Sequence, residues 1–224
     1  PGEGGVGVRG PGRASGGETG NGEVYGCVRV SKDQAVLPRL IDNTQAISLS
    51  AWRTRCRRLR RPQGVSLIVV DYLQLMRPSV GTRPESRVLE ISMITQGLKA
   101  IAKELEVPVI ALSQLSRQVE SREDKRPMLS DLRESGSIEQ DADAVMFVYR
   151  DEYYLQQRMP KETAYDSMDK YAVAMDEWQR KMGLVHNKAE LILEKQRHGP
   201  TGTINLFFEG EYTRFADLDN IHEQ

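Results

Sequence analysis

The sequence predicts an α/β fold built on a mostly parallel sheet with helices on both faces, and three observations favour it. The continuous apolar run at 67–70, rich in β-branched residues, is typical of a strand buried on both faces. A long helical stripe of apolar residues follows at 88–106, and a second apolar strand comes directly after it. A third apolar strand at 144–149 and a closing hairpin complete an order of elements that is typical of an α/β sheet.

Composition limits the classes of function. The 224 residues are enough for one large domain or two small ones. The formal net charge of −1 does not attract nucleic acid to the whole molecule, so such binding has to come from local patches. Cys27 and Cys56 show neither metal-ligand spacing nor a disulfide framework, which suits a reducing cytoplasm. No stretch resembles a transmembrane helix or a signal peptide, so we expect a cytoplasmic protein with no membrane partner.

The first 35 residues differ in character from the rest of the chain. They contain 11 of the 19 glycines and almost no apolar periodicity. Because such a segment has too little apolar surface to bury, we expect it to be disordered. The predicted organisation is a glycine-rich segment at 1–35 and a folded domain at 36–224, which begins near Val36.

The domain opens with a helix at 48–61, which Pro62 and Gly64 end. Its apolar residues recur at helical spacing: Leu49, Trp52, Cys56 and Leu59. Most of the remaining surface of this helix is basic, formed by Arg53, Arg55, Arg57, Arg58, Arg60 and Arg61. A solvated helix face is the interpretation that we favour for these arginines, and a nucleic-acid patch is the alternative.

The later elements follow from periodicity. The stripe of the helix at 88–106 consists of Ile91, Ile94, Leu98, Ile101, Ala102 and Leu105. Pro108 opens the second strand, which ends at Gln114, and residues 150–188 are charged and predict a surface excursion. Two alternating patterns around a Gly/Pro turn, within 188–218, predict the terminal hairpin.

Two strands end in polar side chains that are candidates for phosphate chemistry. Asp71 follows the first strand, and a carboxylate at the rim of an open α/β sheet is costly unless it meets a cation or hydrogen-bond donors. A hydrated magnesium ion fits this position, as in a Walker B segment, whereas the alternative is an Asp that caps the next turn. Gln114 repeats the arrangement, and its amide is suited to sense a phosphate or orient a water. Its alternative role is to anchor a loop.

Lys195 and Arg197 lie two residues apart in the predicted hairpin, which places both cations on one face of a strand. By spacing alone, the pattern favours a solvated edge strand whose charges oppose aggregation.

Several stretches, in this order, resemble bacterial replicative DNA helicases of the DnaB type: IDNTQAISLSAWRTRCRRLRR, LIVVDYLQLM, ALSQLSR, RPMLSDLRESGSIEQDADAVMFVYRDEYY and EKQRHGPTGTINLFFEGEYTRFADL. The resemblance covers Val36 to Leu218. It implies a RecA-like P-loop NTPase core that uses ATP and Mg²⁺ and assembles as a hexameric ring around one DNA strand. It also implies translocation and duplex unwinding at the replication fork, with primase and a helicase loader as partners in the primosome.

The resemblance assigns roles by position. Asp71 matches the Walker B acid that holds magnesium through water, and Gln114 matches the residue that reads the γ-phosphate. Lys195 and Arg197 match the basic pair that one subunit inserts into the ATP site of its neighbour, where positive charge stabilises the transferring phosphoryl group. The resemblance therefore favours this role over a solvated edge strand.

A further stretch, LRESG, matches the loop that grips the DNA strand in the central channel. Its matching residues are Arg133, Glu134 and Gly136. Because a helicase must not depend on base sequence, phosphates are the suitable target for Arg and for backbone N–H groups. The absence of an aromatic residue from this stretch argues for contact with the backbone rather than for stacking on bases.

The phosphate-binding loop of that family, G-x-x-x-x-G-K-[ST], has no counterpart, since the sequence contains no Gly-Lys pair. The segment with the family's catalytic glutamate and the amino-terminal helical collar are also missing. We therefore expect the core to lack its N-terminal strand and P-loop, and the chain alone neither to hydrolyse ATP nor to form a stable ring. Residues 1–35 are interpreted as a shifted reading frame or part of a gene fragment, with a genuine divergent N-terminus as the alternative.

Three functions remain open. The leading hypothesis is the C-terminal part of an ATP-dependent replicative DNA helicase, an enzyme by family. The second is a catalytically incomplete ring subunit, which binds DNA and contributes Lys195 and Arg197 to a complete neighbour. The third is a RecA-like strand-exchange protein, which shares the fold but is disfavoured by the LRESGSIEQDAD and KQRHGPTG stretches.

Overall fold

The computed structural model describes most of the chain from residue 42 to residue 218: residues 42, 44, 46–79, 81, 84–132 and 136–218. The predicted boundary between residues 35 and 36 lies outside these ranges. The described residues form two units, one that ends at Val145 and one that begins at Met146. Each unit is described by itself below, as the N-terminal unit and the C-terminal unit.

The first helix of the N-terminal unit, α1 (Leu49–Gln63), begins and ends where local signals place it. The Oγ of Ser48 accepts a hydrogen bond from the N–H of Ala51, which satisfies one of the free amides of the first turn. Gly64 closes the helix in the left-handed region, with φ of 60°. The apolar positions Trp52 and Cys56 are both 1% exposed, so the predicted helix and its buried face are confirmed.

Four arginines of α1 form ion pairs: Arg53, Arg55, Arg57 and Arg60. Arg53 and Arg57 both donate to Glu104 of the next helix, and Arg60 donates to Glu106 at 3.2 Å. The hydrogen bond from Arg57 lowers the pKa of Glu104, burial raises it by less, and the bond from Arg53 lowers it again. Arg53, Arg57 and Arg60 therefore fasten α1 to α2. The choice between a solvated face and a nucleic-acid patch stays a prediction.

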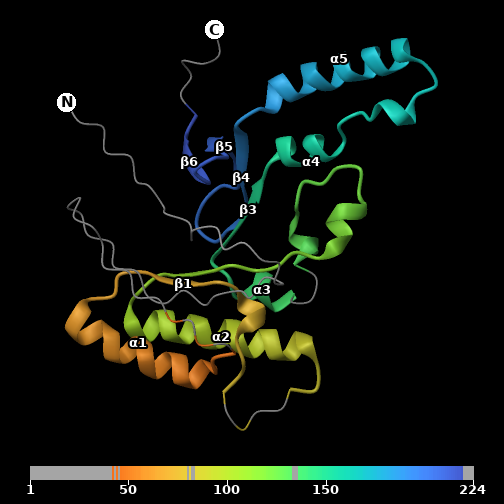
Figure 1. The fold of residues 1–224 in the computed structure, drawn as a ribbon. Helices are drawn as coiled ribbons and strands as arrows, with labels where there is room; N and C mark the ends of the chain where they lie inside the picture. The colour runs from red at the N-terminus through yellow and green to blue at the C-terminus, as the bar shows by residue number, and fades with distance from the viewer. Residues whose placement is uncertain are drawn as a thin grey trace, which may run out of the picture. The chain divides into compact units, whose positions relative to one another are not determined.

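Two short parallel strands form the sheet of the N-terminal unit. β1 (Ile68–Val70) pairs with β2 (Val109–Ala111), and the register sets Ile68 opposite Val109 and Val70 opposite Ala111. The helix α2 (Arg87–Leu105) connects the two strands, as the parallel pairing requires, and lies beside α1 in Figure 1. Five residues of its predicted stripe are buried: Ile91, Ile94, Leu98, Ile101 and Leu105. Ala102 is half-buried.

Polar contacts complete the N-terminal unit. The Oγ1 of Thr95 donates to Asp141 at 2.5 Å, and the Nζ of Lys99 donates to the carbonyl of Asp141 at 2.6 Å. Both bonds hold α3 (Gly136–Asp141) against α2. Before α3, the chain passes through two 3₁₀ segments, η2 (Arg117–Ser121) and η3 (Leu129–Asp131). Asp131, 5% exposed, accepts hydrogen bonds from the N–H of Met128 at 2.8 Å and from Arg122 at 2.7 Å.

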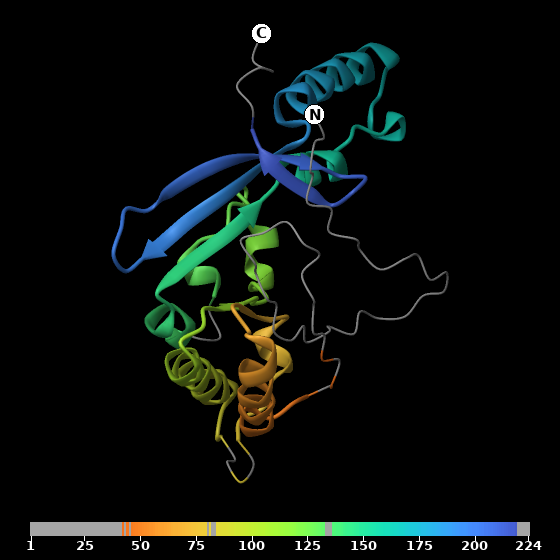
Figure 2. The ribbon, with the colours of Figure 1, turned by 90° about the vertical axis from the view of Figure 1, so that its left-hand side faces the viewer.

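The C-terminal unit contains a sheet in the order β3-β4-β5-β6, whose first strand starts at the end of the N-terminal unit. Its strands are β3 (Ala144–Tyr149), β4 (Lys188–Gln196), β5 (Gly202–Glu209) and β6 (Arg214–Asp217). The pairs β4–β5 and β5–β6 are antiparallel, and β4 and β5 run side by side as a long hairpin in Figure 2. The predicted strand at 144–149 and the predicted hairpin are confirmed.

The expected mostly parallel sheet differs from what the described residues form. They contain two small sheets: β1 and β2 are parallel, whereas β4–β5 and β5–β6 in the other sheet are antiparallel. The physical reason lies in the connections, because short turns join β4, β5 and β6 and such turns join antiparallel neighbours. A crossover helix of the kind that parallel strands need joins β1 to β2.

The predicted surface excursion at 150–188 contains two helices, α4 (Asp151–Gln157) and α5 (Met168–Val185). They are in contact, and the indole Nε1 of Trp178 donates to the carbonyl of Leu155 at 2.8 Å. None of the residues of α5 is buried. Neither α5 nor any other helix of the described residues has the length and apolarity needed to cross a bilayer.

A buried carboxylate anchors α4 to the start of β4. Glu152 is 4% exposed and bonds Arg150 at 3.0 Å and the Nδ1 of His186 at 2.8 Å. Burial raises the pKa of Glu152, but the hydrogen bonds from Arg150, His186 and the N–H of Asn187 together outweigh it and leave the pKa below 4.5. The charged form of Glu152 therefore stabilises the fold above pH 4.5, and this contribution is lost as pH falls through the lowered pKa.

We predict that Glu152→Gln lowers the free energy of unfolding at pH 7 by about 1–3 kcal/mol, because it leaves buried donors without an anionic partner. It should also flatten the fall in stability below pH 4.5, the ordinary value for this carboxyl. Urea unfolding of the chain between neutral and acidic pH measures both effects. Glu211→Gln, at an exposed position after β5, is the control and should leave the curve unchanged; equal curves for the two variants would contradict the anchor role.

Candidate functional site

Asp71 and Gln114 lie on the same edge of the small parallel sheet. Asp71 directly follows β1 and is half-exposed, and Gln114 follows β2 by three residues and is exposed. Because β1 and β2 are parallel and in register, their carboxyl ends meet at one edge. The structure thus places both residues beyond this edge, but Gln114 lies three residues after β2 rather than at the end of the strand as predicted. Their chemical roles stay predictions.

The backbone around Asp71 is held beyond the end of the strands. The N–H of Leu112 donates to the carbonyl of Val70 at 2.9 Å, and the N–H of Leu73 donates to the carbonyl of Leu112 at 2.9 Å. Asp71 lies between these two bonds, and the peptide bond that joins it to Tyr72 is cis. The carboxylate is therefore presented from a backbone that is fixed on both sides.

Gln74 is a residue of this edge that sequence reasoning did not assign to the site. It lies in the 3₁₀ helix η1 (Leu73–Leu75) and is half-buried. Its Nε2 donates to the Oγ of Ser113 at 3.1 Å, and its Oε1 accepts the backbone N–H of Gln114 at 3.3 Å. One side chain near the end of β1 thereby holds the segment that carries Gln114. The available signal was its place three residues after Asp71, inside the DYLQLM stretch.

The first residue of α2 supports Gln74 in turn. The Nη2 of Arg87 donates to the carbonyl of Gln74 at 2.6 Å, and its Nη1 bonds Glu90 at 2.5 Å. Ser86 caps the same helix by accepting the N–H of Leu89 at 3.2 Å. The edge that carries Asp71 and Gln114 is therefore tied to the beginning of a long helix with a buried stripe.

The residues present fit magnesium only in part. Within the part of the chain that the structure describes, no three His, Cys, Asp or Glu side chains gather as a metal site, so Asp71 is a single carboxylate. Magnesium in nucleotide sites is commonly held by one or two carboxylates, water and the phosphates themselves. Asp71 fits that outer role. The sequence contains no phosphate-binding loop whose backbone amides and Lys would cradle the phosphates.

Lys195 and Arg197 lie at one end of the β4–β5 hairpin, in the C-terminal unit. Lys195 is within β4 and half-buried, whereas Arg197 is the first residue after the strand and is exposed. The argument from strand alternation therefore covers only Lys195, because β4 ends at Gln196. In the turn that follows, a Cβ on Gly199 would lie 2.7 Å from the Nε2 of Gln196, so a larger residue there would require this exposed side chain to move.

The predicted DNA-contacting loop is described only at its borders. Arg133 and Glu134 lie outside the described residues, and Gly136 is the first residue of α3. On the side before the gap, Leu132 is 7% exposed, and on the other side Ile138 is 8% exposed. Both borders are thus anchored in the core of the N-terminal unit, which is a suitable frame for a loop that meets a ligand.

Comparison with known proteins identifies the family. The model of the DnaB-like helicase C-terminal domain matches residues 14–217, which is most of the chain. The chain belongs to the DnaB-like helicase C-terminal domain family. The matched range begins before Val36, the point from which the helicase-like stretches were read, and the boundary at residue 35 stays a prediction.

Individual relatives agree with this assignment. The chain is 53% identical over 194 residues to the replicative DNA helicase DnaB of Rickettsia bellii (strain RML369-C), which covers 85% of this chain and 38% of that protein. It is 50% identical to the replicative DNA helicase DnaB of Geobacillus stearothermophilus, over 82% of this chain and 35% of that protein. The chain therefore spans well under half the length of these two relatives.

Solved structures share the fold. A DnaB-like replicative helicase studied for its interactions with primase matches with a TM-score of 0.60 and 41% identity, over 80% of this chain and 37% of that one. Another solved structure, of a single ATPase domain, matches with a TM-score of 0.59 and 42% identity, over 77% of this chain and 52% of that one. The mixed α/β architecture of this chain is thus that of DnaB-type ATPase domains.

We predict that Gln74→Leu releases the segment at 113–114. The substitution keeps the side chain's size but removes both hydrogen bonds, so it should shift the backbone amide resonance of Gln114 and lower the free energy of unfolding by about 1–2 kcal/mol. Amide ¹H–¹⁵N spectra and urea unfolding measure these effects. Gln96→Leu, on the exposed face of α2, is the control; an unmoved Gln114 resonance in Gln74→Leu would contradict the account.

Proposed function

We propose that this chain forms the C-terminal part of a RecA-like ATPase domain in a replicative DNA helicase, which uses ATP to translocate on single-stranded DNA and unwind duplex at the fork. The observation that supports it is the common edge of Asp71 and Gln114, held by Gln74 in a chain of the DnaB-like family. The RecA-like core itself, with helices on both faces of a larger parallel sheet, belongs to this proposal.

Asp71 would hold magnesium through water, and Gln114 would read the γ-phosphate of ATP. The nucleotide with its magnesium supplies the phosphoryl group and neutralises its charge when bound. The chain's own part is positional: β1 fixes the carboxylate of Asp71 at the rim, and Gln74 fixes the backbone of Gln114. A residue that reports whether the γ-phosphate is present must sit on such a held segment, because a mobile one would not transmit the difference.

Lys195 and Arg197 would act in the neighbouring subunit of a hexameric ring. Their position at the end of a long antiparallel hairpin supports this role, since β4 and β5 carry the turn outward on a paired ribbon (Figure 2). Cations delivered from a neighbour stabilise the charge of the transferring phosphoryl group and couple its hydrolysis to the subunit interface. Arg133, Glu134 and Gly136 would contact the phosphates of the DNA strand.

Primase and a helicase loader are the further partners of this proposal. One of the similar solved structures is of a DnaB-like replicative helicase studied for its interactions with primase, which supports primase as a partner of this chain as well. The cytoplasm is the proposed location, because replication takes place there in bacteria and the relatives are bacterial replicative helicases.

A catalytically incomplete ring subunit is the second candidate. The observation that favours it is the lack of any Gly-Lys pair in the 224 residues, which leaves Asp71 without a phosphate cradle. In this case the chain does not hydrolyse ATP by itself, yet it still supplies Lys195 and Arg197 to a complete neighbour. A gene fragment without activity would do neither.

We predict no DNA-stimulated ATPase activity for the chain alone. Mixed with an excess of an intact homologue whose own basic pair has been removed, the chain should enter rings and restore turnover, because it brings Lys195 and Arg197 to the neighbour's ATP. Phosphate release and size-exclusion chromatography measure turnover and assembly.

The test variant combines Lys195→Ala with Arg197→Ala; it should enter rings but reduce the restored turnover by at least about tenfold. The control variant combines Lys181→Ala with Arg180→Ala on α5; it should enter rings and keep the restored turnover. ATPase activity of the chain alone would overturn its predicted inactivity. Failure to enter rings would instead leave the gene fragment as the correct interpretation.

We also predict that Arg133→Ala weakens the binding of mixed rings to single-stranded DNA. Loss of one phosphate contact per added chain should reduce the slope of log K against log salt by about 0.7 for each contact. Fluorescence anisotropy of a labelled oligonucleotide over a salt series gives the slope. Arg180→Ala serves as the control of equal charge; the same slope in Arg133→Ala and the unchanged chain would argue against this DNA contact.

A further inference from the structure

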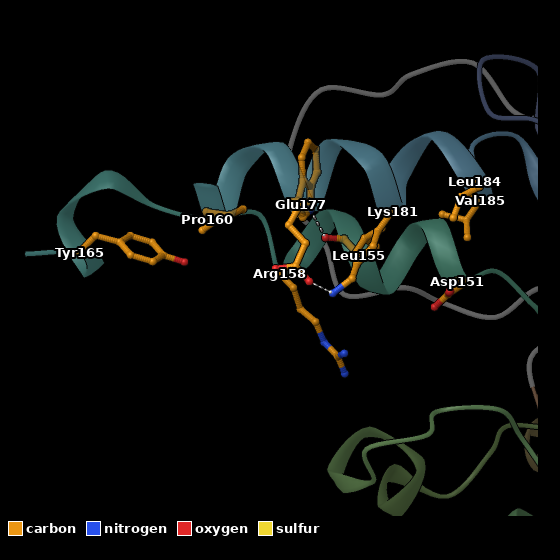
Figure 3. Close-up of a pocket in the computed structure, with 11 residues that line it drawn as sticks. Asp151, Leu155, Arg158, Pro160, Tyr165, Glu177, Lys181, Leu184 and Val185 are labelled. Atoms are coloured by element: carbon orange, nitrogen blue, oxygen red, sulfur yellow. Dashed lines mark hydrogen bonds and ion pairs between the residues drawn. The ribbon is translucent and has the colours of Figure 1, made fainter. Parts of the chain in front are cut away.

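The helices α4 and α5 enclose a groove that no role proposed above uses. We call it the α4–α5 groove; it has a volume of about 500 Å³, and its lining includes Asp151, Leu155, Arg158, Trp178, Lys181 and Leu184. All of these residues belong to the C-terminal unit. Figure 3 shows the two helices side by side and running in opposite directions, with Asp151 near Val185 and Arg158 near Glu177.

The apolar seam of α5 is incompletely covered. Its apolar residues recur at spacings of three and four: Tyr171, Ala174, Met175, Trp178, Met182 and Val185. This is the pattern of a helix that buries one face, yet none of its residues is buried. The length explains the difference, because α4 has 7 residues and α5 has 18. At about 1.5 Å per residue, α4 spans less than half of the seam.

The two walls of the groove have the form that a third helix fits. Along α4 and the C-cap residue that follows it, the lining residues Asp151, Leu155 and Arg158 lie on one face, at spacings of four and three. On α5 the lining residues Ala174, Trp178 and Lys181 do the same. A groove between two antiparallel helices is completed when a third helix packs along it with its apolar residues inward. Leu184, 68% exposed, adds apolar surface at the mouth.

The walls are partly preorganised. The anchor at Glu152 ties the first turn of α4 to His186, the residue that follows α5. The bond from Trp178 to the carbonyl of Leu155 fixes the separation of the helices at mid-groove. Because the walls are held before anything binds, less ordering entropy is lost on binding.

The charges at the mouth select the chemistry of the occupant. Lys181 is paired with Glu177 at 2.8 Å, and Asp151 accepts the hydroxyl of Tyr149 at 3.0 Å. Among the described residues, none makes a hydrogen bond or ion pair with the guanidinium of Arg158, which points away from α5 in Figure 3. Within the described part of the chain, the groove therefore has a cation without an ion-pair partner at Arg158 and an anion at Asp151 that meets only a neutral hydroxyl, so a carboxylate of the occupant complements the Arg158 end.

A nucleic acid fits these charges poorly. Residues 151–185 contain seven acidic and five basic side chains, so a run of phosphates would meet net negative charge. We propose that the α4–α5 groove binds an amphipathic helix of a protein partner, with apolar anchors that pack on Leu155 and Trp178 and one carboxylate that pairs with Arg158. This inference does not depend on the proposed function.

A pair of designed peptides tests the proposal on the full chain. The first is a helical peptide of Leu, Ala and Gln with one Glu placed to face Arg158, and the second carries Lys in place of that Glu. Binding is followed by the indole N–H resonance of Trp178. We expect the Glu peptide to move this resonance and to bind about fivefold more tightly than the Lys peptide.

Charge reversal sharpens the test. Arg158→Glu, at an exposed position, should invert the preference of the two peptides, whereas Arg180→Glu, which makes the same charge change outside the groove, should leave it as it is. Leu184→Glu should weaken both peptides.

Four results would overturn the proposal. The first is a Trp178 resonance that neither peptide moves, and the second is a peptide preference that Arg158→Glu leaves unchanged. The third is displacement of the Glu peptide by a single-stranded oligonucleotide, which would identify a nucleic-acid site. The fourth is self-association of the chain that Leu184→Glu abolishes, which would assign the groove to a second copy.

Discussion

The complete burial of Ile68 and Val70 is the constraint on which the N-terminal unit depends. Both side chains are 0% exposed, so β1 has one register with β2 that keeps its apolar residues inside. That register in turn determines which residue is the first to lie outside the core at the end of each strand. Asp71 leaves it at the end of β1, and Gln114 reaches the same edge from β2. The position of the candidate site is thus a consequence of packing, and the polar contacts of Gln74 refine it.

The helices transmit this constraint to the rest of the unit. The stripe of α2 is buried, its first residue holds Gln74, and its middle holds α3 through Thr95 and Lys99. The two candidate regions of the unit, the edge with Asp71 and the loop before Gly136, are therefore connected to one helix. By contrast α5, which buries none of its residues, is built as a surface that another molecule completes.

The local parts of this structure were predictable and the long-range parts were not. The helices at 49–63 and 87–105 begin at serine caps and carry periodic apolar residues, which are signals within a few positions of sequence. The order of the sheet depends on partners far apart, and the expected mostly parallel sheet proved to be two small sheets. Asp71 and Gln114 were found because a strand end is visible in sequence. The hydrogen bond between Gln74 and Gln114 joins residues 40 positions apart, and the ion pair of Arg57 with Glu104 joins residues 47 positions apart. No local sequence pattern predicts either contact.

Native-state hydrogen exchange tests the dependence on β1 most directly. The account predicts that the backbone amides of 64–76 and 107–114 belong to the slowest class of the N-terminal unit and open together, because neither strand keeps its pairing without the other. The amides of α5 should exchange faster, since no residue of that helix is buried. Separate opening of the two strand segments, or exchange at 64–76 as fast as in α5, would contradict the claim that the buried pair holds the site.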